Sequence, residues 1–220
     1  MKIKHLRPLV ISLCMLSAFL IWTAAVCTVD VNAVGAQETS IGFSTLNTYV
    51  HSLIGVNMPL YELTDIFSVI PLAIVVGFAF LGLFQWIKRK KLSRVDHSII
   101  VLGGFYAVVF ATFIFFEIAV VNYRPVLIDG ALEASYPSST TMLVMCVMPT
   151  ASMQLNSRIK NSTLRRYLTV AIIVFTAFMV ICRLVSGVHW ITDIVGGALL
   201  SAFLVYVYRA VCLHLNTKMI

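Results

Sequence analysis

Two arginines, a histidine and an aspartate have the residue types and spacing of a site that binds an anion and attacks it. Arg183 precedes His189 by six residues, and Asp193 follows His189 by four. On a helix, a spacing of four places His189 and Asp193 on one face, where the carboxylate can accept a hydrogen bond from one imidazole nitrogen. The second nitrogen is then more basic and can act as a nucleophile or general base.

Arg183 shares one unusual property with Arg124. Of the sixteen Lys and Arg residues, these two alone lie outside four basic clusters. The clusters are Lys2, Lys4 and Arg7; Lys88, Arg89, Lys90, Lys91 and Arg94; Arg158, Lys160, Arg165 and Arg166; and Arg209 with Lys218. Because basic loops stay in the cytoplasm, Arg124 and Arg183 belong at the opposite face. Two cations there, with no local excess of acidic partners, indicate a bound anion.

Long apolar stretches separate the basic clusters. They cover 8–29, 66–87, 98–121, 139–155, 167–185 and 190–212. Most are close to the ~20 residues that cross a hydrocarbon core. We therefore predict an all-α fold, a six-transmembrane-helix bundle that forms a single membrane-embedded domain over 1–220. An even number of spans keeps both termini in the cytoplasm and places 30–65, 122–138 and 186–189 at the outer face.

The composition excludes a soluble domain, since 60% of the residues are hydrophobic and 11% are charged. The net charge of +7 follows from cytoplasmic loops that face anionic lipid, so we expect no nucleic-acid partner. The five cysteines fall within predicted spans and have no C-x-x-C or metal-ligand spacing. We therefore expect no metal and no cofactor.

The longest polar segment, 30–65, carries apolar residues near helical spacing. These are Thr45, Leu46, Tyr49, Val50, Leu53, Ile54 and Met58. They predict a short amphipathic helix at the outer face that serves as a lid or cap, with a separate binding module as the alternative. We assign no role to His51. The basic N-terminus and Ala33 and Ala36 resemble a secretory signal, but the apolar region is too long, so we expect an uncleaved first helix.

Two further segments belong with the histidine at the outer face. Glu117 lies in the third span, seven positions before Arg124 and Pro125, and the run 137–141 (Pro-Ser-Ser-Thr-Thr) begins the fourth. A break at Ser186 and Gly187 would turn Arg183 back over His189. The alternative is an ion pair of Arg183 with Asp193 that only ties two helices. Ionisable groups at membrane depth are costly, so a function is the default expectation.

These segments resemble the signature of the type 2 phosphatidic acid phosphatases, a family that includes bacterial undecaprenyl-diphosphate phosphatases and is related to vanadium haloperoxidases. The family motifs are K-x6-R-P, P-S-G-H and S-R-x5-H-x3-D. The chain matches them at Arg124, Pro125, Pro137, Ser138, Arg183, His189 and Asp193. The resemblance implies that His189 attacks phosphorus to form a phosphohistidine and that Asp193 orients it. Arg124 and Arg183, with Ser138, Ser139 and Thr140, would bind the phosphate without a metal.

Four positions depart from the family pattern: Glu117 replaces Lys, Ser139 replaces Gly, Thr140 replaces His and Cys182 replaces Ser. The chain thereby lacks a phosphate-binding cation and the histidine that protonates the leaving alkoxide. In one interpretation Glu117 supplies that proton and the enzyme is active. In another, the protein binds a lipid phosphate without efficient turnover.

A third interpretation is a small transporter or structural membrane protein, which predicts inverted repeats or broken helices that the sequence does not show. We favour an integral membrane phosphatase of the cell membrane, with its active site facing outside. Its substrate would be a lipid phosphate or an isoprenoid diphosphate. A diphosphate leaving group needs little protonation, which favours a diphosphate.

Overall fold

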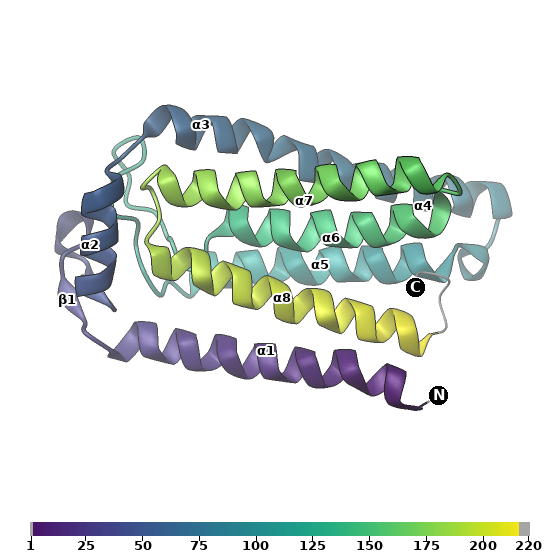
Figure 1. Ribbon diagram of the computed structural model, residues 1–220, viewed down its shortest axis with the longest axis horizontal. Helices are drawn as coiled ribbons and strands as arrows, with labels where there is room; N and C mark the ends of the chain where they lie inside the picture. The colour runs from purple at the N-terminus through teal and green to yellow at the C-terminus, as the bar shows by residue number, and fades with distance from the viewer. Residues whose placement is uncertain (1, 216–220) are drawn as a thin grey trace.

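The computed structural model describes residues 2–215, with side chains from Arg7 onward, and it confirms the predicted all-α class (Figure 1). Six long helices lie side by side along the long axis of the molecule. They are α1 (Lys2–Thr28), α4 (Val69–Arg89), α5 (His97–Ile118), α6 (Ser139–Arg158), α7 (Ser162–Val185) and α8 (Ile191–His214). α6 lies in the centre of the bundle and contacts α4, α5, α7 and α8, while α1 packs on α8.

Five helical segments are long and apolar enough to cross a membrane. They are Arg7–Thr28, Met58–Arg89, His97–Ile118, Ser162–Val185 and Ile191–His214. The central helix α6 is not among them because it carries several polar side chains, including Thr150 and Gln154. Both are fully buried, and Gln154 donates to the Ser98 carbonyl at 3.1 Å. The surrounding helices thus satisfy polar groups that lipid could not.

The connections between helices divide between the two ends of the bundle (Figure 1). One end, which we call the site end, comprises 29–57, 119–138 and 186–190. The other, the basic end, comprises 90–96, which includes η2 (Leu92–Arg94), and 159–161. Most of the described cluster residues lie at or beside the basic end. The side chains of Lys2 and Lys4, and all of Lys218, lie outside the described part of the chain.

The polar segment at the site end is shorter than predicted. The span expected to begin at 66 begins at Met58, where α3 (Met58–Phe67) starts and continues through the helical backbone of Ser68 into α4. The Asn57 side chain caps α3 by accepting from the Leu60 amide at 3.0 Å, and Pro59 occupies its first turn. Residues 58–65 therefore extend the helix into the site end.

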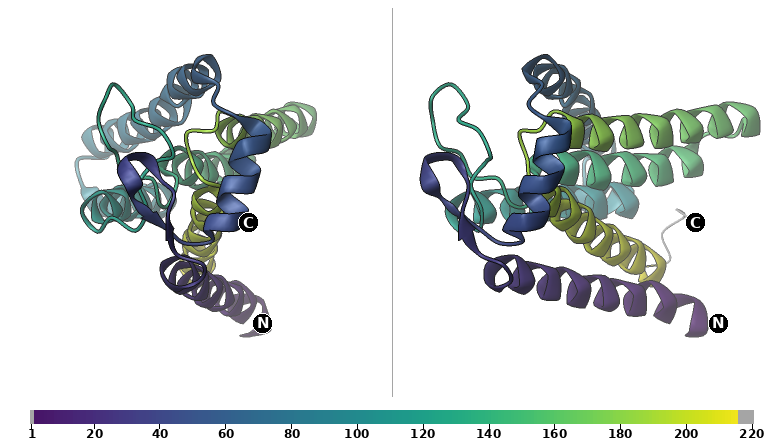
Figure 2. Two further views of the ribbon diagram at one scale, coloured as in Figure 1. Left: turned by 90° about the vertical axis from the view of Figure 1, so that its left-hand side faces the viewer. Right: turned by 60° about the vertical axis from the view of Figure 1, so that its left-hand side comes forward.

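The remaining segment contains the predicted short helix. Strands β1 (Asn32–Ala33) and β2 (Ser40–Ile41) form a small hairpin around η1 (Ala36–Glu38), and α2 (Ser44–Ile54) follows. Figure 2 shows α2 lying across the end of the bundle. Leu46, Tyr49 and Leu53 are exposed on it, whereas its Asn47 is buried and donates to the Thr192 hydroxyl at 3.0 Å. The polar side of α2 thus covers the start of α8.

Candidate active site

The predicted nucleophile lies in a turn, not on a helix. α8 begins at Ile191, and Asp193 caps it by accepting from the backbone N–H of Trp190 at 2.9 Å. His189 and Asp193 are close, but Nδ1 and Oδ2 are 3.8 Å apart, too far for a hydrogen bond. The direct bond expected from helical spacing does not form, because the chain is still outside the helix at His189.

Ser135 connects the two side chains instead. Its Oγ donates to Oδ2 of Asp193 and lies 3.0 Å from Nδ1 of His189. The single hydroxyl hydrogen of Ser135 is used in the hydrogen bond to Asp193. The hydrogen bond between Ser135 and His189 must therefore be donated by Nδ1 of His189. The proton on Nδ1 leaves Nε2 of His189 with a free lone pair. This Nε2 is buried and has no hydrogen-bond partner within residues 7–215.

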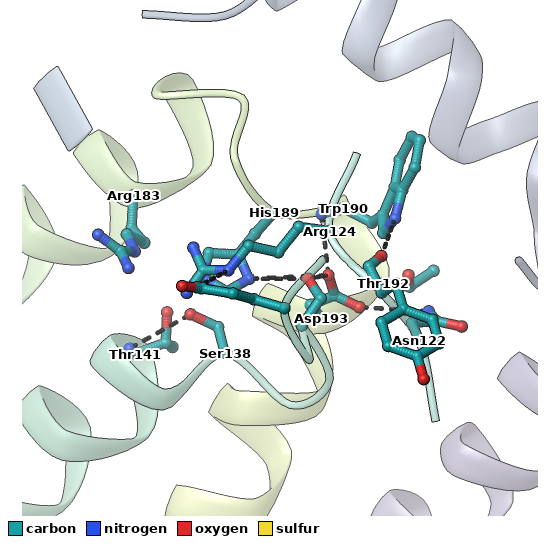
Figure 3. A network of polar contacts seen from close by, with 12 residues as sticks. Asn122, Arg124, Ser138, Thr141, Arg183, His189, Trp190, Thr192 and Asp193 are labelled. Carbon is teal, nitrogen blue, oxygen red and sulfur yellow. Dashed lines mark hydrogen bonds and ion pairs between the residues drawn. The ribbon is translucent and has the colours of Figure 1, made fainter. Parts of the chain in front are cut away.

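The guanidinium groups of Arg124 and Arg183 are buried on the same side of the site as the His189 imidazole (Figure 3), and both lie near the ring of Tyr61. The Cζ atoms of Arg183 and Arg124 are 4.4 Å and 5.6 Å from the ring centroid of Tyr61 in α3. Arg183 is 2% exposed and Arg124 is 7% exposed. The ring face offsets part of the repulsion between the two cations. Burial first, and then Arg124 and Arg183, hold the pKa of His189 well below its usual value, which keeps the imidazole neutral.

Each arginine has one acidic partner, where the sequence suggested none. Nη1 of Arg183 is 3.4 Å from Oδ1 of Asp65, and Nε of Arg124 is 3.1 Å from Oε2 of Glu133. The alternative pair of Arg183 with Asp193 does not form. Asp65 is 57% exposed and Glu133 is 42% exposed, so both carboxylates sit at the rim of the buried site.

The rim contacts leave part of each guanidinium free. Nη1 of Arg124 and Nε of Arg183 are buried without a hydrogen-bond partner among the described residues. Together with Nε2 of His189, they form a group of three unpartnered nitrogens. Leaving buried donors unpaired is costly, so a ligand that accepts from both guanidinium groups would be strongly favoured.

The start of α6 closes the site below these nitrogens (Figure 3). The Ser138 hydroxyl accepts from the Thr141 amide at a long 3.5 Å, and the Ser138 amide donates to the Asp193 carbonyl at 3.0 Å. The Thr141 hydroxyl, which the sequence did not single out, is buried without a partner in the described chain. The free N–H groups of a helix start favour an anion here.

An apolar cavity of about 360 Å³ runs between α4, α5 and α6. Its polar end is formed by Asp65, Ser68, Ser139 and Thr140. The remainder is apolar and is lined by residues that include Leu72, Val75, Val109, Phe110 and Phe113. The cavity can hold part of a hydrocarbon chain whose polar end lies at the start of α6.

A family profile described as the PAP2 superfamily matches residues 119–215. This region of the chain is therefore similar to the PAP2 superfamily. This confirms the resemblance drawn from the three motifs, and it supports a phosphatase. The matched region contains the His189 turn, both arginines and the start of α6, but it does not include α3.

Among solved structures, the chain is similar to a crystal structure described as the first transmembrane PAP2 type phosphatidylglycerolphosphate phosphatase from Bacillus subtilis. The TM-score is 0.63 at 19% identity, and the match covers 93% of this chain and 96% of the other. At this identity the likeness shows a common fold. No curated protein sequence matches the chain. Five helices are long and apolar enough to cross a membrane, which makes this a multi-pass membrane protein, and the profile match supports a lipid phosphatase.

Glu117, which replaces the lysine of the family motif, is not among the ion-pair partners of the two arginines, which are Glu133 and Asp65. Glu117 is exposed in the last turn of α5 and lines a small separate cavity with Ser135, Pro137 and Ser139. Within the described chain it has no ion pair or hydrogen bond. Its role as a substitute proton donor stays a prediction. Thr140, in the position of the family histidine, lines the larger apolar cavity instead.

His51, which received no role from the sequence, contacts the turn that carries His189. Its Nε2 donates to the Gly187 carbonyl at 3.1 Å, and its ring lies 5.5 Å from that of Trp190. Gly187 has φ +69°, and a Cβ there would lie 1.9 Å from the Gly55 carbonyl oxygen. The end of α2 and the turn that carries His189 are therefore in direct backbone contact.

Proposed function

We propose that this protein hydrolyses lipid phosphates or isoprenoid diphosphates at the outer face of the cell membrane, through a phosphohistidine on His189. The group of unpartnered nitrogens carries the proposal. Nη1 of Arg124 and Nε of Arg183 are unused donors, and Nε2 of His189 is an unused lone pair. A phosphoryl group supplies acceptors for the first two and an electrophile for the third.

The geometry supports nucleophilic catalysis by His189. Its Nε2 attacks phosphorus while the bond to the leaving oxygen breaks, and Arg124 and Arg183 stabilise the charge on the equatorial oxygens. The positive charge that develops on the imidazole is stabilised through Ser135 by Asp193. Water then cleaves the P–N bond and returns His189 to its free state.

The apolar cavity and the distribution of charge support the substrate class and the orientation. A lipid chain in the cavity would bring its phosphate to Ser139 and Thr140 at the start of α6. The basic end belongs in the cytoplasm by the positive-inside rule, so the site end would face outward and both termini would be cytoplasmic.

Phosphate release from purified protein tests the activity, with a short-chain phosphatidate and farnesyl diphosphate as substrates. Wild type should release phosphate, and His189→Ala should lower the rate by at least about 10⁴-fold while the protein stays folded by thermal unfolding. A His189→Ala variant with full activity would exclude the mechanism. A folded wild type that binds orthovanadate but releases no phosphate would favour the alternative of a binding protein with impaired turnover.

Thiol labelling tests the orientation separately. In a cysteine-free background, Asp129→Cys at the site end should react with an impermeant reagent added to intact cells. Lys160→Cys at the basic end should react only after the membrane is opened. Labelling of Lys160→Cys from outside would reverse the orientation without bearing on the chemistry.

A further inference from the structure

α3 brings a carboxylate to the phosphate site from outside the region that matches the PAP2 profile. Asp65 lies 3.4 Å from Nη1 of Arg183, and the same Nη1 donates to the neighbouring Thr64 hydroxyl at 3.1 Å. Tyr61, one turn earlier on α3, stacks on the same guanidinium. Three residues of α3 thus contact Arg183, and Asp65 is the acidic one among them.

Asp65 also lies at the polar end of the apolar cavity, together with Ser139 and Thr140. If the substrate chain fills the apolar part, its phosphate or diphosphate group, and with it the leaving oxygen, lies at this polar end. In phosphoryl transfer the attacking and leaving atoms are in line. The water that later attacks the phosphohistidine therefore enters where the leaving oxygen departed, beside Asp65.

No other acidic residue of the described chain lines this cavity. Glu133 contacts Arg124, and Glu117 lines a different, smaller cavity. Thr140 lines the cavity but has only a hydroxyl, which cannot take up a proton at neutral pH. A carboxylate can accept a proton in general base catalysis, so Asp65 has the chemistry of a base.

We propose that Asp65 is the general base that activates water for hydrolysis of the phosphohistidine. This inference rests on the proposed function. The water oxygen bonds to phosphorus while one water proton passes to the Asp65 carboxylate. The P–N bond breaks, and its electron pair returns to Nε2 of His189. Phosphate leaves, and Asp65 then releases the proton to solvent.

The same placement selects among substrates. In the first step the leaving group departs toward a carboxylate that has no proton to give. An alkoxide needs that proton, whereas the phosphate monoester released from a diphosphate does not. The site therefore favours isoprenoid diphosphates over phosphatidates.

Rapid-quench kinetics with farnesyl diphosphate labelled in its terminal phosphate tests the role of Asp65. In Asp65→Asn the label should enter His189 at a rate within a few-fold of wild type. It should then accumulate to about one per protein as an acid-labile, alkali-stable adduct, while steady-state turnover falls roughly 10²-fold or more. Asp65→Glu should restore part of the turnover. Glu62→Gln, an exposed carboxylate on the same helix, is the matched control and should behave as wild type.

The outcomes separate the two proposals. If Asp65 only holds Arg183, Asp65→Asn will slow labelling of His189 and no adduct will accumulate, which would overturn the inference. Accumulation in Glu117→Gln in place of Asp65→Asn would overturn it too. A wild type that neither releases phosphate nor labels His189 would overturn the proposed function itself.

Discussion

Both ends of the bundle carry arginines and carboxylates, but these groups are paired with one another at the basic end and are only partly paired at the site end. At the basic end, Asp96 accepts from Arg89 at 2.9 Å and from Gln85 at 2.9 Å, and it lies 3.7 Å from Arg158. At the site end, Arg124 and Arg183 each keep a buried nitrogen without a partner in the described structure. Charged groups that find all their hydrogen-bond partners within the protein stabilise the fold. Buried donors without a partner can instead bind a ligand.

This difference has a cost in stability. A buried donor left unpaired costs about 1–3 kcal/mol, and more when it is charged. Proteins accept such costs where the ligand supplies the missing acceptor. Partial burial opposes ionisation of Asp96, but hydrogen bonds from Arg89 and Gln85 outweigh it and lower the pKa of Asp96. The basic end is thus stabilised by the charges that it contains.

Exchanging matched arginines should separate the two ends most clearly. Arg183→Gln removes a cation that would stabilise the negative charge of the transition state. It should lower kcat/KM by about 10²–10³-fold. Arg158→Gln should leave kcat/KM within about twofold of wild type but should lower the unfolding temperature more than Arg183→Gln does. Phosphate release and thermal unfolding in the same detergent measure both effects. Equal losses of activity in the two variants would contradict the contrast.

The serine between His189 and Asp193 gives a second, smaller test. Ser135→Ala removes the acceptor of Nδ1–H and one donor to Asp193, so it should slow turnover by about 10–10²-fold without loss of fold. Ser135→Thr keeps the hydroxyl and should keep most of the activity. Asp96→Asn removes the centre of the network at the basic end, yet it should not change the rate. Normal activity in Ser135→Ala would mean that Asp193 does not act through this serine.

The sequence predicted the parts of the site that lie in its motifs. The charge clusters predicted that Arg124, Arg183 and His189 lie at the end of the bundle opposite the basic loops, and the structure has them at that end; that this end faces outward stays a prediction. Ser135 and Asp65 were missed. Ser135 reaches a histidine 54 residues later in the chain, and the Asp65–Arg183 pair joins positions 118 apart. No local periodicity reports such contacts, since they depend on how the helices pack.

The predicted hydrogen bond between His189 and Asp193 was wrong for a local reason. The i, i+4 spacing brings two side chains together only if both residues lie in a regular helix. Asp193 instead turns back to cap its own helix at Trp190, so the preceding histidine sits in the turn. The extra turns of α3 were also missed, since the polar residues Glu62 and Asp65 lowered the apolar signal of 58–65.

The charge state of His189 provides the smallest and sharpest test. Because burial and two nearby cations lower its pKa, His189 should remain neutral at pH 6 in the free protein. Arg124→Gln removes one cation, so protonation becomes easier and the pKa should rise. Nitrogen-15 NMR of labelled histidine in micelles would follow the titration. A midpoint at or above 6.5 in wild type would contradict the lowered pKa, and an unchanged midpoint in Arg124→Gln would show that this guanidinium does not act on the imidazole.

The contact between Gly55 and Gly187 matters for anyone who builds chimeras from this scaffold. The carbonyl of residue 55 occupies the space that a side chain at 187 would need. A chimera whose α2 comes from another protein and ends in a different backbone direction would clash with residue 187. A larger residue at 187 would clash with the carbonyl of residue 55, and either clash would displace His189. Residues 43–57 and 186–190 must therefore be exchanged together, as one interchangeable part.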